Sequence, residues 1–141
     1  MERVAVAELN PGLALPRTNI TVVHREDDSG TTFLFSEFLS RSSEPWRTQV
    51  GAARSLRWPL GEGRSGNGGV AATVQRTRVS IGYVEYAYAR QHRLISASVR
   101  NASGEFARPR RESFEAATAA VPWREFGDLS QLLIGLPGRS T

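Results

Sequence analysis

The feature that most constrains the fold is a strand, a polar turn and a helix that follow one another within residues 19–41. Residues 19–24 (NITVVH) are mostly β-branched and apolar, which is the composition of a buried strand. Residues 25–32 (REDDSGTT) are polar, and from Phe33 to about Arg41 apolar side chains recur at helical spacing. This order places the N-terminus of a helix at the carboxyl end of a strand, which is typical of α/β proteins.

Later segments continue the alternation. Strands are predicted at residues 79–84 and 95–99, and helices at 46–50, 70–75, 86–92 and 111–120. Residues 55–59 predict a short extended segment, 61–69 a glycine-rich loop, and the stretch up to Pro16 an irregular lead-in. We therefore expect an α/β domain in which helices cover a sheet.

Length and composition fit one folded domain of 141 residues, with 40% hydrophobic and 23% charged side chains. No apolar run approaches the roughly 20 residues needed to cross a bilayer. The first seven residues are too short and too interrupted for a secretory signal. The chain has no Cys, which excludes disulfides, Cys-ligated zinc and a thiol nucleophile. The sequence predicts neither a metal site nor a cofactor.

The formal net charge is +4, and all 18 basic residues are arginine. A basic chain raises the question of nucleic acid or small anions as ligands. The arginines are scattered except for residues 108–111 (RPRR), which adjoin Glu112 and Glu115. This cluster is interpreted as the solvated start of a helix, so no nucleic-acid partner is expected.

The polar turn is the strongest candidate for a binding site. The first N–H groups of a helix have no partner within the helix, and the helix dipole makes that end electropositive. Ser29, Gly30 and Thr31 would offer backbone N–H groups and two hydroxyls to an oxyanion. Arg25, at the end of the strand, could add a bidentate guanidinium, and Asp27 is placed to hold that guanidinium from behind. These residues predict an anion site.

A simpler interpretation of the same turn stays open on this evidence alone. Asp28 or Ser29 could be an ordinary helix cap, with Arg25 a surface residue.

Residues 25–33 (REDDSGTTF) resemble the phosphate-binding segment of the phosphate-specific periplasmic binding proteins, in which an Arg is followed four residues later by Ser-Gly-Thr. The resemblance continues in order along the chain. It includes residues 9–13 (LNPGL), 58–59 (WP), 66–71 (GNGGVA), 75–76 (QR) and 81–89 (IGYVEYAYA).

The resemblance implies one lobe of a type II periplasmic-binding-protein fold, an α/β lobe with a mostly parallel sheet flanked by helices. It implies Arg25, Ser29, Gly30 and Thr31 as ligands of inorganic phosphate, with Asp27 in support of the arginine. It further implies a periplasmic binding module that hands phosphate to the membrane permease of an ABC transporter. No catalysis, metal or direct membrane insertion is implied.

The chain also departs from this family. Residues 1–8 are a lead-in without a match, residues 9–128 form the expected second lobe, and residues 129–141 are a divergent tail. The family's first lobe, which supplies an aspartate that accepts the phosphate proton, has no counterpart in this sequence. The chain therefore resembles a truncated open reading frame or an excised lobe. We expect its ends to pack poorly and one sheet edge to be unpaired. With donors alone, the lobe should bind phosphate weakly and barely prefer it to sulfate.

Two rival functions follow from the same residues. The chain could be an inert gene fragment with an intact motif, or a phosphatase-like enzyme that uses the oxyanion cradle. The enzyme has little support, because no nucleophile–base pair is evident and His24 is better explained as a strand-end residue. The pattern G-x-G-x-x-G at residues 61–66 is not directly placed between a strand and a helix, which a dinucleotide site requires.

Overall fold

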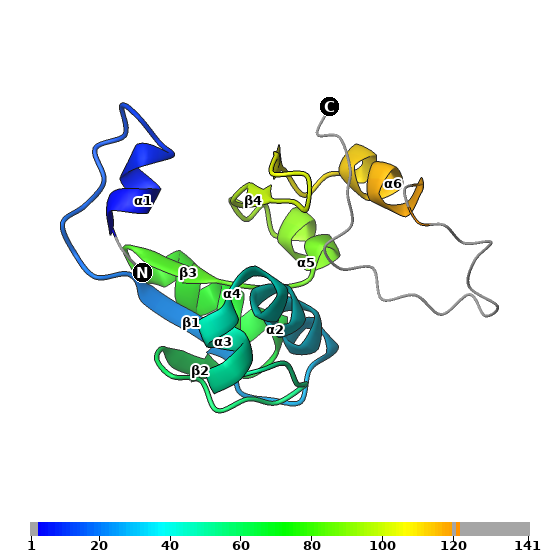
Figure 1. Ribbon diagram of the computed structural model, residues 1–141. Coiled ribbons are helices and arrows are strands. Elements are labelled where there is room, and N and C mark those ends of the chain that lie inside the picture. Colours follow the sequence, from blue (N-terminus) through cyan, green and yellow to red (C-terminus); the bar gives the residue numbers. More distant parts are fainter. Residues whose placement is uncertain (1–2, 120, 122–141) are drawn as a thin grey trace.

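The computed structural model describes residues 3–119 and residue 121 (Figure 1). In chain order the elements are α1 (Arg3–Glu8), β1 (Thr21–Arg25), α2 (Gly30–Ser42), α3 (Glu44–Gln49), β2 (Glu62–Arg64), α4 (Gly66–Arg76), β3 (Ser80–Gly82), α5 (Tyr86–Gln91), β4 (Val99–Arg100), β5 (Phe106–Ala107) and α6 (Arg111–Ala119).

A parallel three-stranded sheet with the order β2-β1-β3 is the centre of the fold. The β-branched run of β1 lies in the middle, where Val23 faces Glu62 of β2 on one side and Gly82 of β3 on the other. Because all three strands are parallel, their carboxyl ends meet at one edge of the sheet. That edge carries the polar turn after Arg25.

Helix α4 covers one face of this sheet. Val23 is completely buried, and a methyl group added to its register partner Gly82 would lie only 2.8 Å from Cγ1 of Val70 in α4. Position 82 therefore requires glycine, because any larger residue would push α4 away from the sheet. Val70 and Ala71 complete the buried apolar contact on this side.

Aromatic rings cover the opposite face, since His24 follows Val23 and points the other way. The ring of His24 stacks on Trp58 at 4.9 Å between centroids, and Trp58 stacks on Tyr83 at 5.7 Å. Tyr83 in turn stacks on Phe35 of α2 at 4.6 Å. This stack joins α2 to the sheet, so helices lie on both faces and the predicted α/β class with a parallel sheet is confirmed.

The remaining elements lie further from the sheet in Figure 1, with α1 on one side and α5, the β4–β5 hairpin and α6 on the other. The β4–β5 hairpin is antiparallel, with Val99 opposite Ala107. Within the part of the chain that the structure describes, β2 and β3 each pair only with β1, so each leaves an edge of the sheet open.

Three local predictions were wrong. The glycine-rich loop at 61–69 contains strand β2 and the first turn of α4, because its backbone pairs with β1 although its side chains carry no strand pattern. The strand predicted at 95–99 is absent, and the chain enters β4 only at Val99. The lead-in contains the short helix α1. The predicted divergent tail at 129–141 lies outside the described residues.

Candidate functional site

Strand β1 ends at Arg25, and a four-residue turn leads to α2. The Glu26 amide donates to the Arg64 carbonyl at 3.2 Å, which extends the pairing of β1 with β2 by one residue. The Ser29 amide donates to the Arg54 carbonyl at 3.0 Å and anchors the other end of the turn. The turn therefore has a fixed start and a fixed end.

Ser29 is the N-cap of α2, and its Oγ accepts the Thr32 amide at 3.3 Å. Ser29 is buried, Gly30 is exposed and Thr31 is half-buried. Among the described residues, no group accepts a hydrogen bond from the amides of Gly30 or Thr31. The first turn of a 13-residue helix thus presents two free N–H donors at its electropositive end.

The guanidinium of Arg25 is held in place by neighbours from two elements. Its Nε donates to Oδ1 of Asp27 at 2.7 Å and its Nη2 donates to Oδ2 of the same carboxylate, while Nη1 donates to Oδ1 of Asn67 at 3.2 Å. The side chain is only 10% exposed. A guanidinium has five N–H donors, so two of them remain without a partner among the described side chains.

Asp27 completes this clamp. Besides Arg25, its Oδ1 accepts the backbone amide of Gly66, the first residue of α4, at 3.0 Å. Gly66 has φ = +64°, a left-handed conformation that favours glycine and turns its N–H toward the carboxylate. The hydrogen bonds from Arg25, and then that from Gly66, hold the pKa of Asp27 well below its usual range. Asp27 is therefore a carboxylate at any physiological pH.

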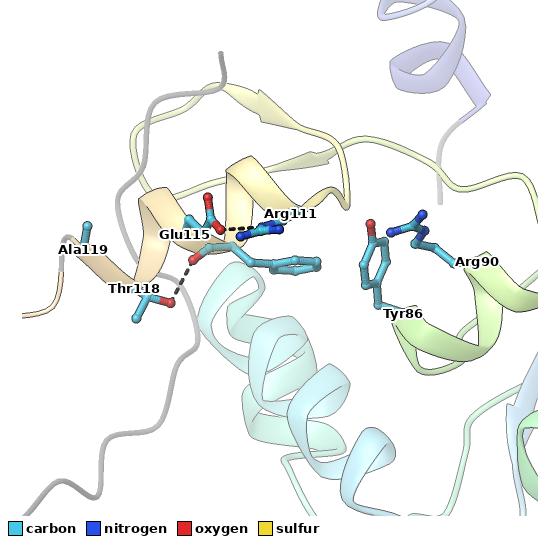
Figure 2. Close-up of a pocket in the computed structure, with 7 residues that line it drawn as sticks. Tyr86, Arg90, Arg111, Glu115, Thr118 and Ala119 are labelled. Carbon is cyan, nitrogen blue, oxygen red and sulfur yellow. Dashed lines mark hydrogen bonds and ion pairs between the residues drawn. The ribbon is translucent and has the colours of Figure 1, made fainter.

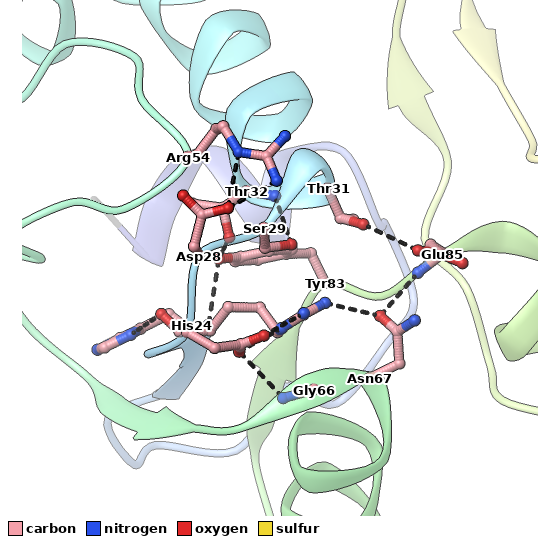
Figure 3. A network of polar contacts seen from close by, with 12 residues as sticks. His24, Asp28, Ser29, Thr31, Thr32, Arg54, Gly66, Asn67, Tyr83 and Glu85 are labelled. Atoms are coloured by element: carbon pink, nitrogen blue, oxygen red, sulfur yellow. Dashed lines mark hydrogen bonds and ion pairs between the residues drawn. The ribbon is translucent and has the colours of Figure 1, made fainter.

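A second polar chain links Arg25 to the start of α2 (Figure 3). Oδ1 of Asn67, which accepts from Arg25, also accepts the backbone amide of Glu85 at 3.3 Å. The hydroxyl of Thr31 in turn donates to Oε1 of Glu85 at 3.4 Å. Residues 40 to 60 positions apart in sequence thus meet at the carboxyl edge of the sheet.

The structure places the five predicted site residues at the end of β1, in the turn that follows it and in the first turn of α2. Asp27 holds Arg25 at the strand end, and Ser29, Gly30 and Thr31 form the cap and first turn of α2. Whether Arg25 and the two free amides bind the same anion stays a prediction. His24 offers no base for Ser29, because its ring stacks on Trp58 and its Nδ1 lies 3.1 Å from the Arg25 carbonyl oxygen.

Comparison with known proteins places the chain in a family. A family model described as a PBP superfamily domain matches residues 7–132. The chain belongs to the PBP superfamily. Within the described residues, no helix is long and apolar enough to span a membrane, and no three potential ligands from His, Cys, Asp and Glu gather into a metal site.

The PBP-superfamily chain is a homologue of proteins named phosphate-binding protein PstS. It is 46% identical to that of Haemophilus influenzae over 133 residues, which are 94% of this chain and 40% of the relative. It is 47% identical to that of Pasteurella multocida over 134 residues, 95% of this chain and 39% of the relative. The PstS of Methanocaldococcus jannaschii is 40% identical over 123 residues, 82% of this chain and 32% of the relative.

The chain thus spans about two fifths of the length of the first two of these relatives. The family resemblance found in the sequence is confirmed. These relatives belong to a family of binding proteins rather than enzymes, as the sequence predicted. The division into residues 1–8, 9–128 and 129–141 stays a prediction.

Sequence reasoning missed three contributors to the turn in this PBP-superfamily chain. Tyr83 stacks on Phe35, and its hydroxyl also accepts the Arg25 amide at 3.1 Å and lies 2.8 Å from Thr32 Oγ1. Asn67 and Glu85 were not singled out. The available signal was their position: each follows the carboxyl end of a strand neighbouring β1.

The structure also has a cavity of about 650 Å³ away from this turn (Figure 2). It lies between α5 and α6, and its walls include Tyr86, Arg90, Arg111 and Phe114. Arg111 is paired with Glu115 one helical turn later at 2.6 Å, and both side chains are mostly exposed. This cavity brings together no residue of the predicted phosphate set.

Proposed function

We propose that this chain binds inorganic phosphate through Arg25, Ser29, Gly30 and Thr31, with Asp27 in support. In this proposal it acts as the phosphate-gripping lobe of the substrate-binding component of a phosphate ABC transporter. It works in the periplasm and delivers phosphate to membrane permease subunits. The transport role rests on the homology to PstS proteins.

The observation that carries the proposal is the state of Arg25. A charged side chain that is 90% buried normally has all its donors satisfied, because an unpaired buried donor is costly. Arg25 instead retains two unpartnered N–H groups, although Asp27 and Asn67 hold the guanidinium rigidly. The turn that begins α2, two residues beyond Asp27, adds two free amides. A tetrahedral oxyanion has the charge and the several acceptors that such a set of donors requires.

The test is a titration of the full chain with inorganic phosphate at fixed ionic strength, followed by amide NMR signals. We expect the signals of Gly30 and Thr31 to move with a Kd of about 1 mM, which corresponds to ~4 kcal/mol. Arg25→Ala should remove these shifts, because it deletes the charged donor. The matched control Arg111→Ala, which removes a paired arginine from α6, should leave the Kd unchanged.

Two results would contradict the proposal. The first is a folded wild-type chain whose Gly30 and Thr31 signals do not move at roughly ten times the expected Kd, which would support an inert fragment. The second is equal binding by wild type and Arg25→Ala. Hydrolysis of a phosphate ester that is lost in Ser29→Ala would instead favour the phosphatase-like alternative.

A further inference from the structure

Glu85 has a fixed backbone position next to the Arg25 guanidinium. Its amide donates to Oδ1 of Asn67 at 3.3 Å, and the same oxygen accepts Nη1 of Arg25 at 3.2 Å. One amide oxygen therefore joins the guanidinium to the segment between β3 and α5. A shift in the position of Arg25 would therefore also move the backbone of Glu85, and the reverse.

The carboxylate of Glu85 faces the first turn of α2 (Figure 3). Oε1 accepts the hydroxyl of Thr31, but the distance of 3.4 Å is long compared with the usual ~2.7–2.8 Å for an O–H···O bond. Asp27 is neutralised by Arg25 and Asp28 by Arg54. Among the described side chains, no cation forms an ion pair with Glu85, so its carboxylate keeps acceptor capacity at the turn.

The position of Glu85 places a carboxylate acceptor beside a turn for which the sequence predicted donors alone. At neutral pH a phosphate ion still carries at least one proton, whereas sulfate carries none. A carboxylate beside the anion can accept the P–OH proton in a hydrogen bond, but it can only repel sulfate. Arg25, Gly30 and Thr31 cannot distinguish the two ions, because they supply donors that both ions accept.

We propose that Glu85 is a specificity-determining residue of this lobe, whose carboxylate accepts the hydrogen of bound phosphate and thereby disfavours sulfate. The inference rests on the proposed function. The Thr31 hydroxyl donates to Oε1 of Glu85 by one long hydrogen bond, and when phosphate binds, the P–OH group donates to the carboxylate while the Thr31 hydroxyl donates to the anion. No bond other than hydrogen bonds is made or broken in this exchange.

The size of the effect is set by exposure. Glu85 lies at the surface, where water competes for its hydrogen bonds. We therefore expect the full chain to prefer phosphate over sulfate by about fivefold, equivalent to ~1 kcal/mol. A buried acceptor would give a much larger ratio.

The experiment measures the Kd of inorganic phosphate and of sulfate for the full chain at pH 7 and fixed ionic strength, in wild type, Glu85→Gln and Glu26→Gln. Glu85→Gln is nearly isosteric and keeps an oxygen for Thr31, but it adds an N–H₂ group that sulfate can use. Its phosphate-to-sulfate ratio should fall to about one, mainly through tighter sulfate binding.

Glu26→Gln is the matched control, because it removes the same charge next to Arg25 while its carboxylate lies against Gly63 of β2. Loss of a negative charge changes the general repulsion of anions, and this alters the affinities for phosphate and sulfate together in either variant. Only the phosphate-to-sulfate ratio therefore shows whether the carboxylate acts as a hydrogen-bond acceptor. We expect Glu26→Gln to keep the wild-type ratio.

The outcomes separate the two claims. A wild-type ratio near one, or a ratio that Glu85→Gln leaves unchanged, overturns the role of Glu85 while phosphate binding stands. A ratio that falls equally in Glu26→Gln overturns it as well. If the wild type binds neither ion, both the proposed function and this inference fail.

Discussion

Arginine lies close to tyrosine in two regions of this molecule, and only one of them holds its arginine side chain in a fixed position. In residues 21–85, here called the sheet region, Arg25 is 10% exposed and is fixed by a carboxylate, an amide oxygen and a strand. In residues 86–119, here called the outer region, Arg111 is 82% exposed and pairs with Glu115 on its own helix. The outer region nevertheless has the cavity of about 650 Å³.

The larger cavity is thus not the region in which the arginine is held most firmly. A ligand must repay the ordering of every flexible group that it contacts, and a guanidinium already fixed by its neighbours has no such cost. The sheet region holds its donors before any ligand arrives. In the outer region Arg111 is held only by Glu115 of its own helix, and both side chains are mostly exposed to solvent.

Shortening one apolar side chain in each region tests this comparison most strongly. Val23→Ala should lower the free energy of unfolding by about 2 kcal/mol, because Val23 is completely buried against α4. Val99→Ala, in the half-exposed β4, should cost less than about 0.5 kcal/mol. Urea unfolding followed by circular dichroism measures both. Equal costs would show that the sheet region is not the better packed of the two.

A hydroxyl deletion tests how far the aromatic stack positions the turn. Tyr83→Phe keeps the rings together but leaves the Arg25 amide and Thr32 Oγ1 without their common partner, so it should cost about 1.5 kcal/mol. Tyr86→Phe is the control in the outer region, where the ring packs against Phe114 and no described residue bonds the hydroxyl. The same urea experiment should show almost no change for it. A neutral Tyr83→Phe would mean that water replaces the lost hydroxyl.

Charge removal should give the smallest effect. Asp27→Asn should cost about 1 kcal/mol at pH 7, because it weakens two charge-assisted bonds on a carboxylate that is one-third exposed. Glu115→Gln should cost less than about 0.5 kcal/mol, as expected for an exposed pair one helical turn apart.

The stabilising effect of the Asp27 carboxylate should also depend on pH in a defined direction. The folded-state pKa of Asp27 is lowered, chiefly by hydrogen bonds from Arg25. Its stabilising contribution is therefore complete above the unfolded pKa of about 3.9 and is lost as pH falls toward the folded value. Wild type and Asp27→Asn should differ in urea midpoint at pH 7 and converge as the pH falls below about 4. A constant difference across this range would exclude the ion pair as its cause.

The sequence predicted the strand–turn–helix unit because everything that defines it is local. The β-branched run, the cap Ser29 and the spacing of Arg25 and Asp27 all lie within a dozen residues. Strand β2 was missed because Glu62, Gly63 and Arg64 have no strand pattern, and they become a strand only by pairing with β1. Here the pairing with a neighbouring strand determines a secondary structure that the intrinsic strand propensity of the residues does not.

The same reason explains which part of the candidate site was missed. Asn67 and Glu85 lie 42 and 60 residues after Arg25, and only the parallel sheet brings them to its end. Topology rules place loops at this edge, but they do not say which side chain in a loop turns inward. A single sequence therefore predicted the donors, which follow one another, and not the acceptor, which comes from a distant loop.

The ring stack behind the turn has a practical consequence. Tyr83 touches the turn through its hydroxyl and the indole of Trp58 through its ring, at 5.7 Å between centroids. The emission of an indole depends on the electric field and the motion of the groups around it. The intrinsic fluorescence of Trp58 should therefore respond to changes at the first turn of α2, without any added label.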